Sequence, residues 1–232
     1  MNDNYVSTQI CVYKTNKVLV EFMDKLKPAS TNGYAHLHAT GDSVDVNGRK
    51  EYSLIGITML DYSKGKGDKA SRARANISPD EAKYIYSRLY AGFPTFELSQ
   101  DKIFGTPDGA GQSDVTKLYI SRQPTDNQGN VKTHPWYIHL ENGKGISVKN
   151  RNGGTYMQSG SYIKQRTVSA NLTDLDMFKL MSRVTCYISA WESAFAPSLI
   201  ANGRQALAMA MQQASTTQQP YYSEYYPDQQ SA

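Results

Sequence analysis

Two stretches far apart in the chain carry similar junctions between an extended segment and a helix. Residues 73–90 read ARANISPDEAKYIYSRLY, and residues 168–185 read VSANLTDLDMFKLMSRVT. A shift of 95 positions (170 − 75) aligns Ala75-Asn76 with Ala170-Asn171 and Ser87-Arg88 with Ser182-Arg183. Helix capping requires neither pair, so we interpret the likeness as an internal duplication.

Each junction supplies its helix with an N-cap. The hydroxyls of Ser78 and Thr173 can accept hydrogen bonds from the free N–H groups of the first turn. Glu81 and Asp176 stand three residues later, where they can complete a capping box. Apolar residues at helical spacing follow both caps. The sequence therefore predicts a helix after each cap, the second running to about residue 195, and a further helix over 198–214.

Extended segments precede both predicted helices. Residues 16–26 form an apolar run that fits a strand or a short helix. The remaining patterns predict strands over 34–40, 51–62, 69–77, 115–123, 135–143, 144–150 and 161–172. Asn47-Gly48 predicts one hairpin, and Asn142-Gly143 predicts another. The expected fold class is α+β, with two antiparallel-sheet-plus-helix repeats at about 34–92 and 115–195, joined by the polar segment 105–114.

Composition sets the domain organisation. The chain has 232 residues and 39% hydrophobic content, enough for one large domain or two small ones with a core. Because the two repeats share one pattern, we expect a single domain over 1–214 that contains both repeats and the C-terminal helix. The final stretch, 215–232, is rich in Gln, Tyr, Ser and Pro and is predicted to be a disordered tail. We expect no membrane span and no secretory signal. Cys11 and Cys186 have no nearby partner in sequence, which is typical of thiols in a reducing compartment and favours a cytoplasmic protein.

Basic residues gather just ahead of both predicted helices, although the net charge is only +4. Solvated loops are one interpretation of these two clusters. A shared anionic ligand would explain why both are basic in the same place. The first cluster contains Lys64, Lys66, Lys69, Arg72 and Arg74, and the second contains Lys144, Lys149, Arg151, Lys164 and Arg166.

Aromatic residues accompany these cations. Tyr52 and Tyr62 precede the first cluster, and Trp136, Tyr156 and Tyr162 surround the second. Single-stranded nucleic acids bind proteins through cations that contact phosphates and rings that stack on bases. Each aromatic residue could instead fill the core. Trp136 and its neighbour Tyr137 point to opposite faces of a strand, so we expect one of the two in the core.

Catalytic and metal-binding patterns are missing from the sequence. His36 and His38 share a strand face, but no Cys or acidic cluster accompanies them, so they are interpreted as ordinary strand histidines. GKGDKAS (65–71) lacks the spacing of a phosphate-binding loop. No serine lies in a nucleophile elbow. We therefore expect no enzyme activity, no cofactor and no bound metal.

The duplicated order of strands and one helix, with basic and aromatic strands ahead of it, resembles the Whirly family of single-stranded-DNA-binding proteins. It is also similar to the related transcriptional coactivator family, in which a single unit dimerises. The likeness rests on RARANISPDEAKYIYSRL and QRTVSANLTDLDMFKLMSRV and covers roughly residues 34–195. The resemblance implies that the helices pack together, that nucleic acid runs across the sheets, and that the protein forms oligomers, often four-fold.

The sequence thus leads us to expect a single-stranded-DNA-binding protein with little sequence specificity, acting in replication or recombination in a phage or mobile element. RNA binding uses the same surface physics and stays open. A structural or assembly protein that binds other proteins through aromatic surfaces and the tail is the alternative. The tail also looks similar in layout to those by which phage and bacterial single-strand binding proteins recruit replication partners, here through Tyr221, Tyr222, Tyr225 and Tyr226.

Overall fold

The computed structural model describes residues 6–30 and 36–217. The chain divides into two compact units, one formed by the chain up to Lys27 and Tyr52–Trp191, the other by Pro28–Glu51 and the chain from Glu192. The first unit contains both large sheets, the first helix and the beginning of the second. The predicted α+β class is confirmed.

Four strands of the first unit form an antiparallel meander, which we call the first sheet. It comprises β1 (Gln9–Lys14), β2 (Val18–Lys25), β5 (Leu54–Asp61) and β6 (Ser71–Ile77), in that order. The apolar run at 16–26 is therefore a strand. Alternate residues of these strands, such as Phe22, Ile57 and Ala75, are buried, as expected for a sheet with one face on the core. The short η1 (Gly67–Lys69) precedes β6.

The second sheet is built from β7 (Phe96–Phe104), β8 (Gln112–Arg122), β9 (Trp136–Lys149), β10 (Thr155–Met157) and β11 (Ile163–Leu172). β9 pairs with β8 along one edge and with β11 and then β10 along the other. The predicted turn at Asn142-Gly143 is wrong, because both residues lie inside β9 and pair on both sides. The sequence interpretation also missed β7, and the strands leading to the two helices begin at Gln9 and Phe96 rather than at 34 and 115.

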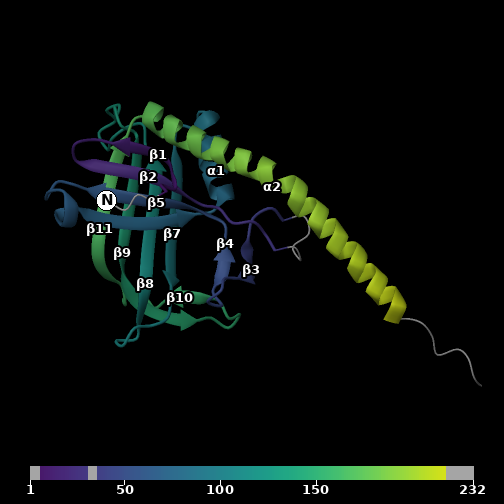
Figure 1. Cartoon of the computed structure of the whole chain (residues 1–232). Helices are drawn as coiled ribbons and strands as arrows, with labels where there is room; N and C mark the ends of the chain where they lie inside the picture. Colours follow the sequence, from purple (N-terminus) through teal and green to yellow (C-terminus); the bar gives the residue numbers. More distant parts are fainter. Residues whose placement is uncertain (1–5, 31–35, 218–232) are drawn as a thin grey trace, which may run out of the picture. The chain divides into compact units, whose positions relative to one another are not determined.

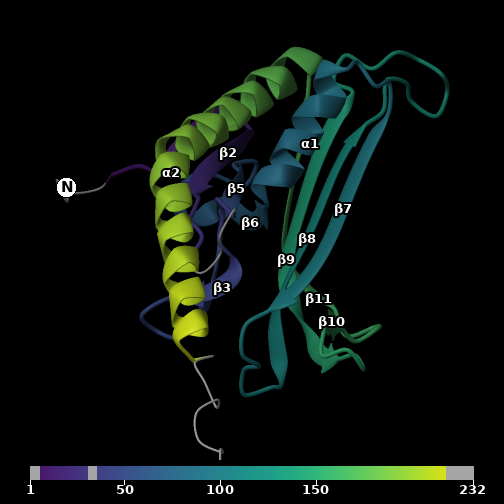
Figure 2. The same cartoon turned by 90° about the vertical axis from the view of Figure 1, so that its right-hand side faces the viewer.

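The two sheets cross steeply, with the first lying across the upper part of the second in the view of Figure 1. Their facing sides share one core, in which Phe22 and Ile57 of the first sheet join Leu118 and Leu140 of the second. Such orthogonal packing leaves part of a longer sheet uncovered. Because the strands of the second sheet are longer, their far halves extend beyond the first sheet (Figure 2).

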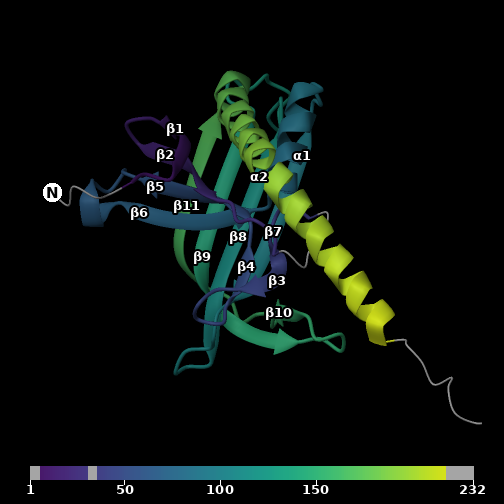
Figure 3. The same cartoon turned by 45° about the vertical axis from the view of Figure 1, so that its right-hand side comes forward.

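Both helices of the first unit begin at the predicted caps. α1 (Pro79–Tyr90) has a complete capping box between Ser78 and Glu81. α2 (Asp174–Thr217) begins after Thr173, whose hydroxyl accepts from the Asp176 N–H at 3.1 Å. Ile85 of α1 and Val184 of α2 are buried in the shared core, and the first turns of α2 lie beside α1 at one end of the sheets (Figure 3). The similar order of strands and helix in the two halves is compatible with a duplication, which stays a prediction.

α2 continues without interruption through Pro197 and Gly203. The predicted break between two C-terminal helices is therefore wrong, although Pro197 removes one backbone hydrogen bond from the helix. The predicted disordered tail lies outside the described residues from 218 on, and residues 215–217 are the last of α2. None of the helices in the described part of the chain is both long and apolar enough to cross a membrane.

The second unit contains a small hairpin of β3 (Thr40–Val44) and β4 (Lys50–Tyr52). Its turn holds Gly48 at a φ of 73°, which confirms the hairpin predicted from Asn47-Gly48. His38 Nε2 lies at hydrogen-bond distance, 3.0 Å, from Oε1 of Glu192 in α2.

Asp174 ties the start of α2 to the second sheet. Its Oδ1 accepts from Trp136 Nε1 at 2.7 Å, and its two oxygens accept from Arg122 at 2.8 and 2.9 Å. The hydrogen bond from Arg122 is the main cause that lowers the pKa of Asp174. We expect Asp174→Ala to lower the free energy of unfolding by about 2 kcal/mol, because the buried indole N–H loses its acceptor.

The lowered pKa gives this contribution a pH dependence. The stabilisation that the ionised Asp174 carboxylate provides is fully present above the ordinary carboxyl pKa of 3.8 and is lost as the pH falls below that value. Urea unfolding of the native chain and Asp174→Ala at pH 7 and pH 3 measures both expectations. If the native chain and Asp174→Ala differ in their free energy of unfolding by the same amount at both pH values, this assignment is contradicted. Asp174→Asn is the control, because its amide oxygen can still accept from Trp136.

The two cysteines are free thiols in different surroundings, Cys11 buried and Cys186 exposed. Burial raises the pKa of Cys11 from 9.0 to about 11, although Arg183 opposes the shift. At pH 8 we expect Cys186 to react with a disulfide reagent at least about 100-fold faster than Cys11, because the thiolate is the nucleophile. Cys186→Ser should remove the fast phase, and a fast phase that persists in this variant would contradict the assignment.

Candidate nucleic-acid interface

Strand β6 is the free edge of the first sheet, and it runs across the second sheet from β11 to β7. At its start, Ser71 Oγ donates to the Thr167 carbonyl of β11 at 3.4 Å. Midway, the Asn142 amide of β9 accepts from the Arg74 N–H at 2.7 Å and donates to the Arg74 carbonyl at 2.8 Å. At its end, Lys102 Nζ of β7 donates to the Asn76 carbonyl at 3.2 Å.

A row of side chains on the second sheet follows this edge. Arg166, Asn142, Thr116 and Lys102 are successive cross-strand partners on β11, β9, β8 and β7. Paired residues of an antiparallel sheet project from the same face. Because Asn142 contacts β6 from this face, its row partners Arg166 and Lys102 flank the strand. Both of these cations are exposed.

Further cations line β6 from the first sheet. Arg72 and Arg74 alternate with buried alanines and are exposed. Lys25 of β2 lays its stem over Gly56 and donates to Asn76 Oδ1 at 2.9 Å. We call Lys25, Arg72, Arg74, Lys102 and Arg166 the β6 cation row. At about 3.3 Å per strand residue, the stretch from Ser71 to Asn76 spans about 17 Å.

The β6 cation row has no matching anions. Within residues 6–30 and 36–217, none of its five members forms a salt bridge. Desolvation, followed by the positive charge of Arg74, lowers the pKa of Lys25. A cation beside Lys25 favours a bound anion, since the anion's charge relieves the repulsion. The regularly spaced phosphates of a nucleic-acid strand would match this row of cations.

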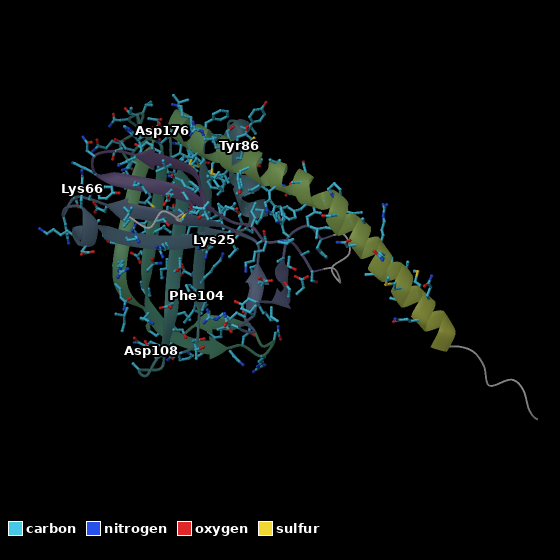
Figure 4. The ribbon with its side chains drawn as sticks, viewed as in Figure 1. Lys25, Lys66, Tyr86, Phe104, Asp108 and Asp176 are labelled. Carbon is cyan, nitrogen blue, oxygen red and sulfur yellow. The ribbon has the colours of Figure 1, made fainter. Side chains whose placement is uncertain are left out.

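The first basic cluster extends the β6 cation row at one end. Lys64, Lys66 and Lys69 lie exposed in the turn from β5 into β6. Lys66 projects at the tip of this turn, apart from the labelled Lys25 and Phe104 (Figure 4). Because the chain runs from this turn directly into Arg72 and Arg74, the whole predicted first cluster forms one continuous basic strip.

Two lysines of the second cluster are neutralised by acids. Lys144 Nζ lies 2.9 Å from Asp114 and 3.4 Å from Asp108, and the hydrogen bond to Asp114 raises the pKa of Lys144. Lys164 Nζ lies 3.0 Å from Glu141 Oε1. An ion-paired lysine has less positive charge to offer a phosphate. These two residues are therefore weaker candidates than Arg166, which pairs with Asn142 in the row beside β6.

The other basic residues of the second cluster lie far from β6. Lys149 ends β9, seven residues and roughly 23 Å along the strand from Asn142. Arg151 is exposed in the following turn, and Tyr156 is exposed on β10. The structure thus separates these three residues from the β6 cation row, although they were predicted to belong to one ligand site.

The predicted stacking aromatics are mostly unsuited to that role. Trp136 is completely buried and donates to Asp174, so neither face of its ring can stack on a base. Trp136 is therefore not part of the candidate interface. Tyr162 is half-buried on the opposite face of the second sheet, with Lys117 Nζ 4.7 Å from its ring centroid. Burial and the Glu141 carboxylate raise the pKa of Tyr162 to about 12. Tyr52 is exposed at the end of β4, and Tyr62 is half-buried after β5.

The structure offers a different ring beside the β6 cation row. Phe104 of β7 is 53% exposed and lies two residues from Lys102, hence on the same strand face. The sequence interpretation missed Phe104, Lys102 and Lys25. The alternation in FELSQDKIF, residues 96–104, is the signal that could have revealed β7 and placed Lys102 and Phe104 together.

The arrangement can bind a phosphate chain and stack a base on Phe104. Comparison of the chain with protein-family models, with curated proteins and with solved structures finds no match. The argument for a ligand therefore rests on the charges and the geometry around β6.

Proposed function

We propose that this chain is a non-enzymatic single-stranded-DNA-binding protein with little sequence specificity, acting in DNA replication or recombination. The observation that carries the proposal is the β6 cation row, whose five members lie on β6 or beside it and form no salt bridge in the described part of the chain. Phosphate contacts supply affinity without reading sequence. Phe104 would add stacking, which every base permits.

The resemblance to Whirly proteins supports the same proposal, because those proteins bind single-stranded DNA across sheets that precede helices. On this basis we also propose a homo-oligomer, from a phage or a mobile element, that recruits replication proteins through its C-terminal tail. The two free thiols support the proposal of a cytoplasmic protein.

An anisotropy titration with labelled oligo-dT, and with a duplex of the same length, tests the proposal. We expect tighter binding to oligo-dT, and an affinity whose logarithm falls linearly with the logarithm of the salt concentration, because phosphate contacts release counterions. Absence of binding at low salt, salt-independent binding, or tighter binding to the duplex would each overturn it.

Oligo-U in the same assay separates DNA from RNA. The 2′-hydroxyl is the group that distinguishes the two at a contact site. Tighter binding of oligo-U than of oligo-dT would reassign the protein to RNA and contradict the proposed ligand.

A further inference from the structure

The second unit carries an exposed apolar stripe on α2. Ile200, Leu207 and Met211 are 36%, 44% and 64% exposed. At 3.6 residues per turn they fall within about 40° of one another around the helix axis. Exposed apolar residues that line up on one helix face are typical of an interaction surface rather than of solvent contact.

The charge of this stretch restricts its partner. Residues 193–217 contain one charged residue, Arg204, and no acid. A nucleic acid or an acidic protein would find a single cation there, and a basic protein would find no carboxylate. A second copy of the same face is also nearly uncharged, so two identical stripes can meet without charge repulsion.

We propose that the stripe Ile200–Leu207–Met211 pairs with the same stripe of a second copy, in an antiparallel arrangement that places Ile200 opposite Met211. In a parallel pair the two Arg204 side chains would face each other. The antiparallel register instead sets each Arg204 against Leu207 of the second copy, where its stem covers apolar surface while its guanidinium reaches water. The dimer is isologous and closed.

Substitutions on opposite sides of α2 test this pairing. Met209 is 52% exposed, comparable to Leu207, but lies about 180° from Ile200 around the axis. We expect Leu207→Lys to weaken dimerisation of the full chain by about tenfold or more in analytical ultracentrifugation, because it places a charge in an apolar contact and beside Arg204 of the second copy. Met209→Lys should change the dissociation constant by less than about twofold. Circular dichroism establishes that both variants keep the helix. A native chain that stays monomeric, or equal effects of both variants, would overturn the proposal.

Disulfide trapping tests the register independently of any folding defect. In a Cys186→Ser background, chains carrying Ile200→Cys are mixed with chains carrying Met211→Cys. We expect a disulfide between the two kinds of chain and none between two Ile200→Cys chains, which the register separates by about 16 Å along the axis. A disulfide formed only between Ile200→Cys chains indicates a parallel pair, and no disulfide at all indicates no pairing. Either result rejects the proposal.

Discussion

A triple variant that removes three cations beside β6 is expected to bind oligo-dT about a hundredfold more weakly than the native chain. Each lost contact to a phosphate contributes roughly 1 kcal/mol at these exposed positions, and about 1.4 kcal/mol corresponds to tenfold. The slope of log affinity against log salt should fall by about 2, at about 0.7 per phosphate. Anisotropy titration at several salt concentrations measures both quantities. The variant combines Arg74→Ala, Lys102→Ala and Arg166→Ala.

A control with the same loss of net charge separates local contacts from the overall field of the protein. Lys17, Lys132 and Lys179 are exposed and lie outside the β6 cation row. Their triple alanine variant should bind oligo-dT within about threefold of the native chain, because distant exposed charges are screened by salt. Equal losses in the two variants would show that β6 has no special role.

Replacement of Gly143 by alanine is expected to lower the free energy of unfolding by about 3 kcal/mol or more. A Cβ at this position would collide with the Ile163 carbonyl oxygen of β11 and would lie 2.8 Å from Tyr162 Cε2. Backbone cannot move aside as a flexible side chain can, so the cost reaches the upper end of the range for overpacking. Urea unfolding monitored by circular dichroism measures it.

Gly109 provides the matched control for this substitution. A Cβ added there meets no atom within 4 Å, and its φ is not among the positive values. Gly109→Ala should therefore change the free energy of unfolding by less than about 0.5 kcal/mol. If Gly143→Ala is equally mild, β9 and β11 approach each other less closely at this point than the structure shows.

Gly143 also explains one limit of the sequence interpretation. Asn-Gly between apolar runs predicts a two-residue hairpin, and the rule succeeded at Asn47-Gly48. At Asn142-Gly143 the glycine serves a close approach between strands, and the asparagine binds the backbone of β6. Both roles depend on segments about twenty residues or more away, which local turn chemistry cannot reveal.

Local signals gave reliable predictions wherever the physics was local. The caps at Ser78 and Thr173 marked the helix starts because capping involves residues only three positions apart. The composition of residues 63–74 likewise predicted a basic strip that the structure makes continuous. Lys25 and Lys102 were missed because their charges meet at Asn76 only when two sheets cross. Lys144 and Lys164 were predicted to be free for a ligand because the acids that pair with them lie outside the basic stretch of sequence.

The amide of Asn142 has a consequence for the kind of polymer that can lie along β6. A free edge strand ordinarily invites an extended peptide to add as a further strand, through its unpaired backbone groups. Here Asn142 already occupies both groups of Arg74, and Lys102 occupies the Asn76 carbonyl. β-Augmentation is thereby blocked, and the strand can be recognised only through the side chains beside it. A nucleic acid can bind in this way, because its phosphates are exposed along the chain and can contact the cationic side chains.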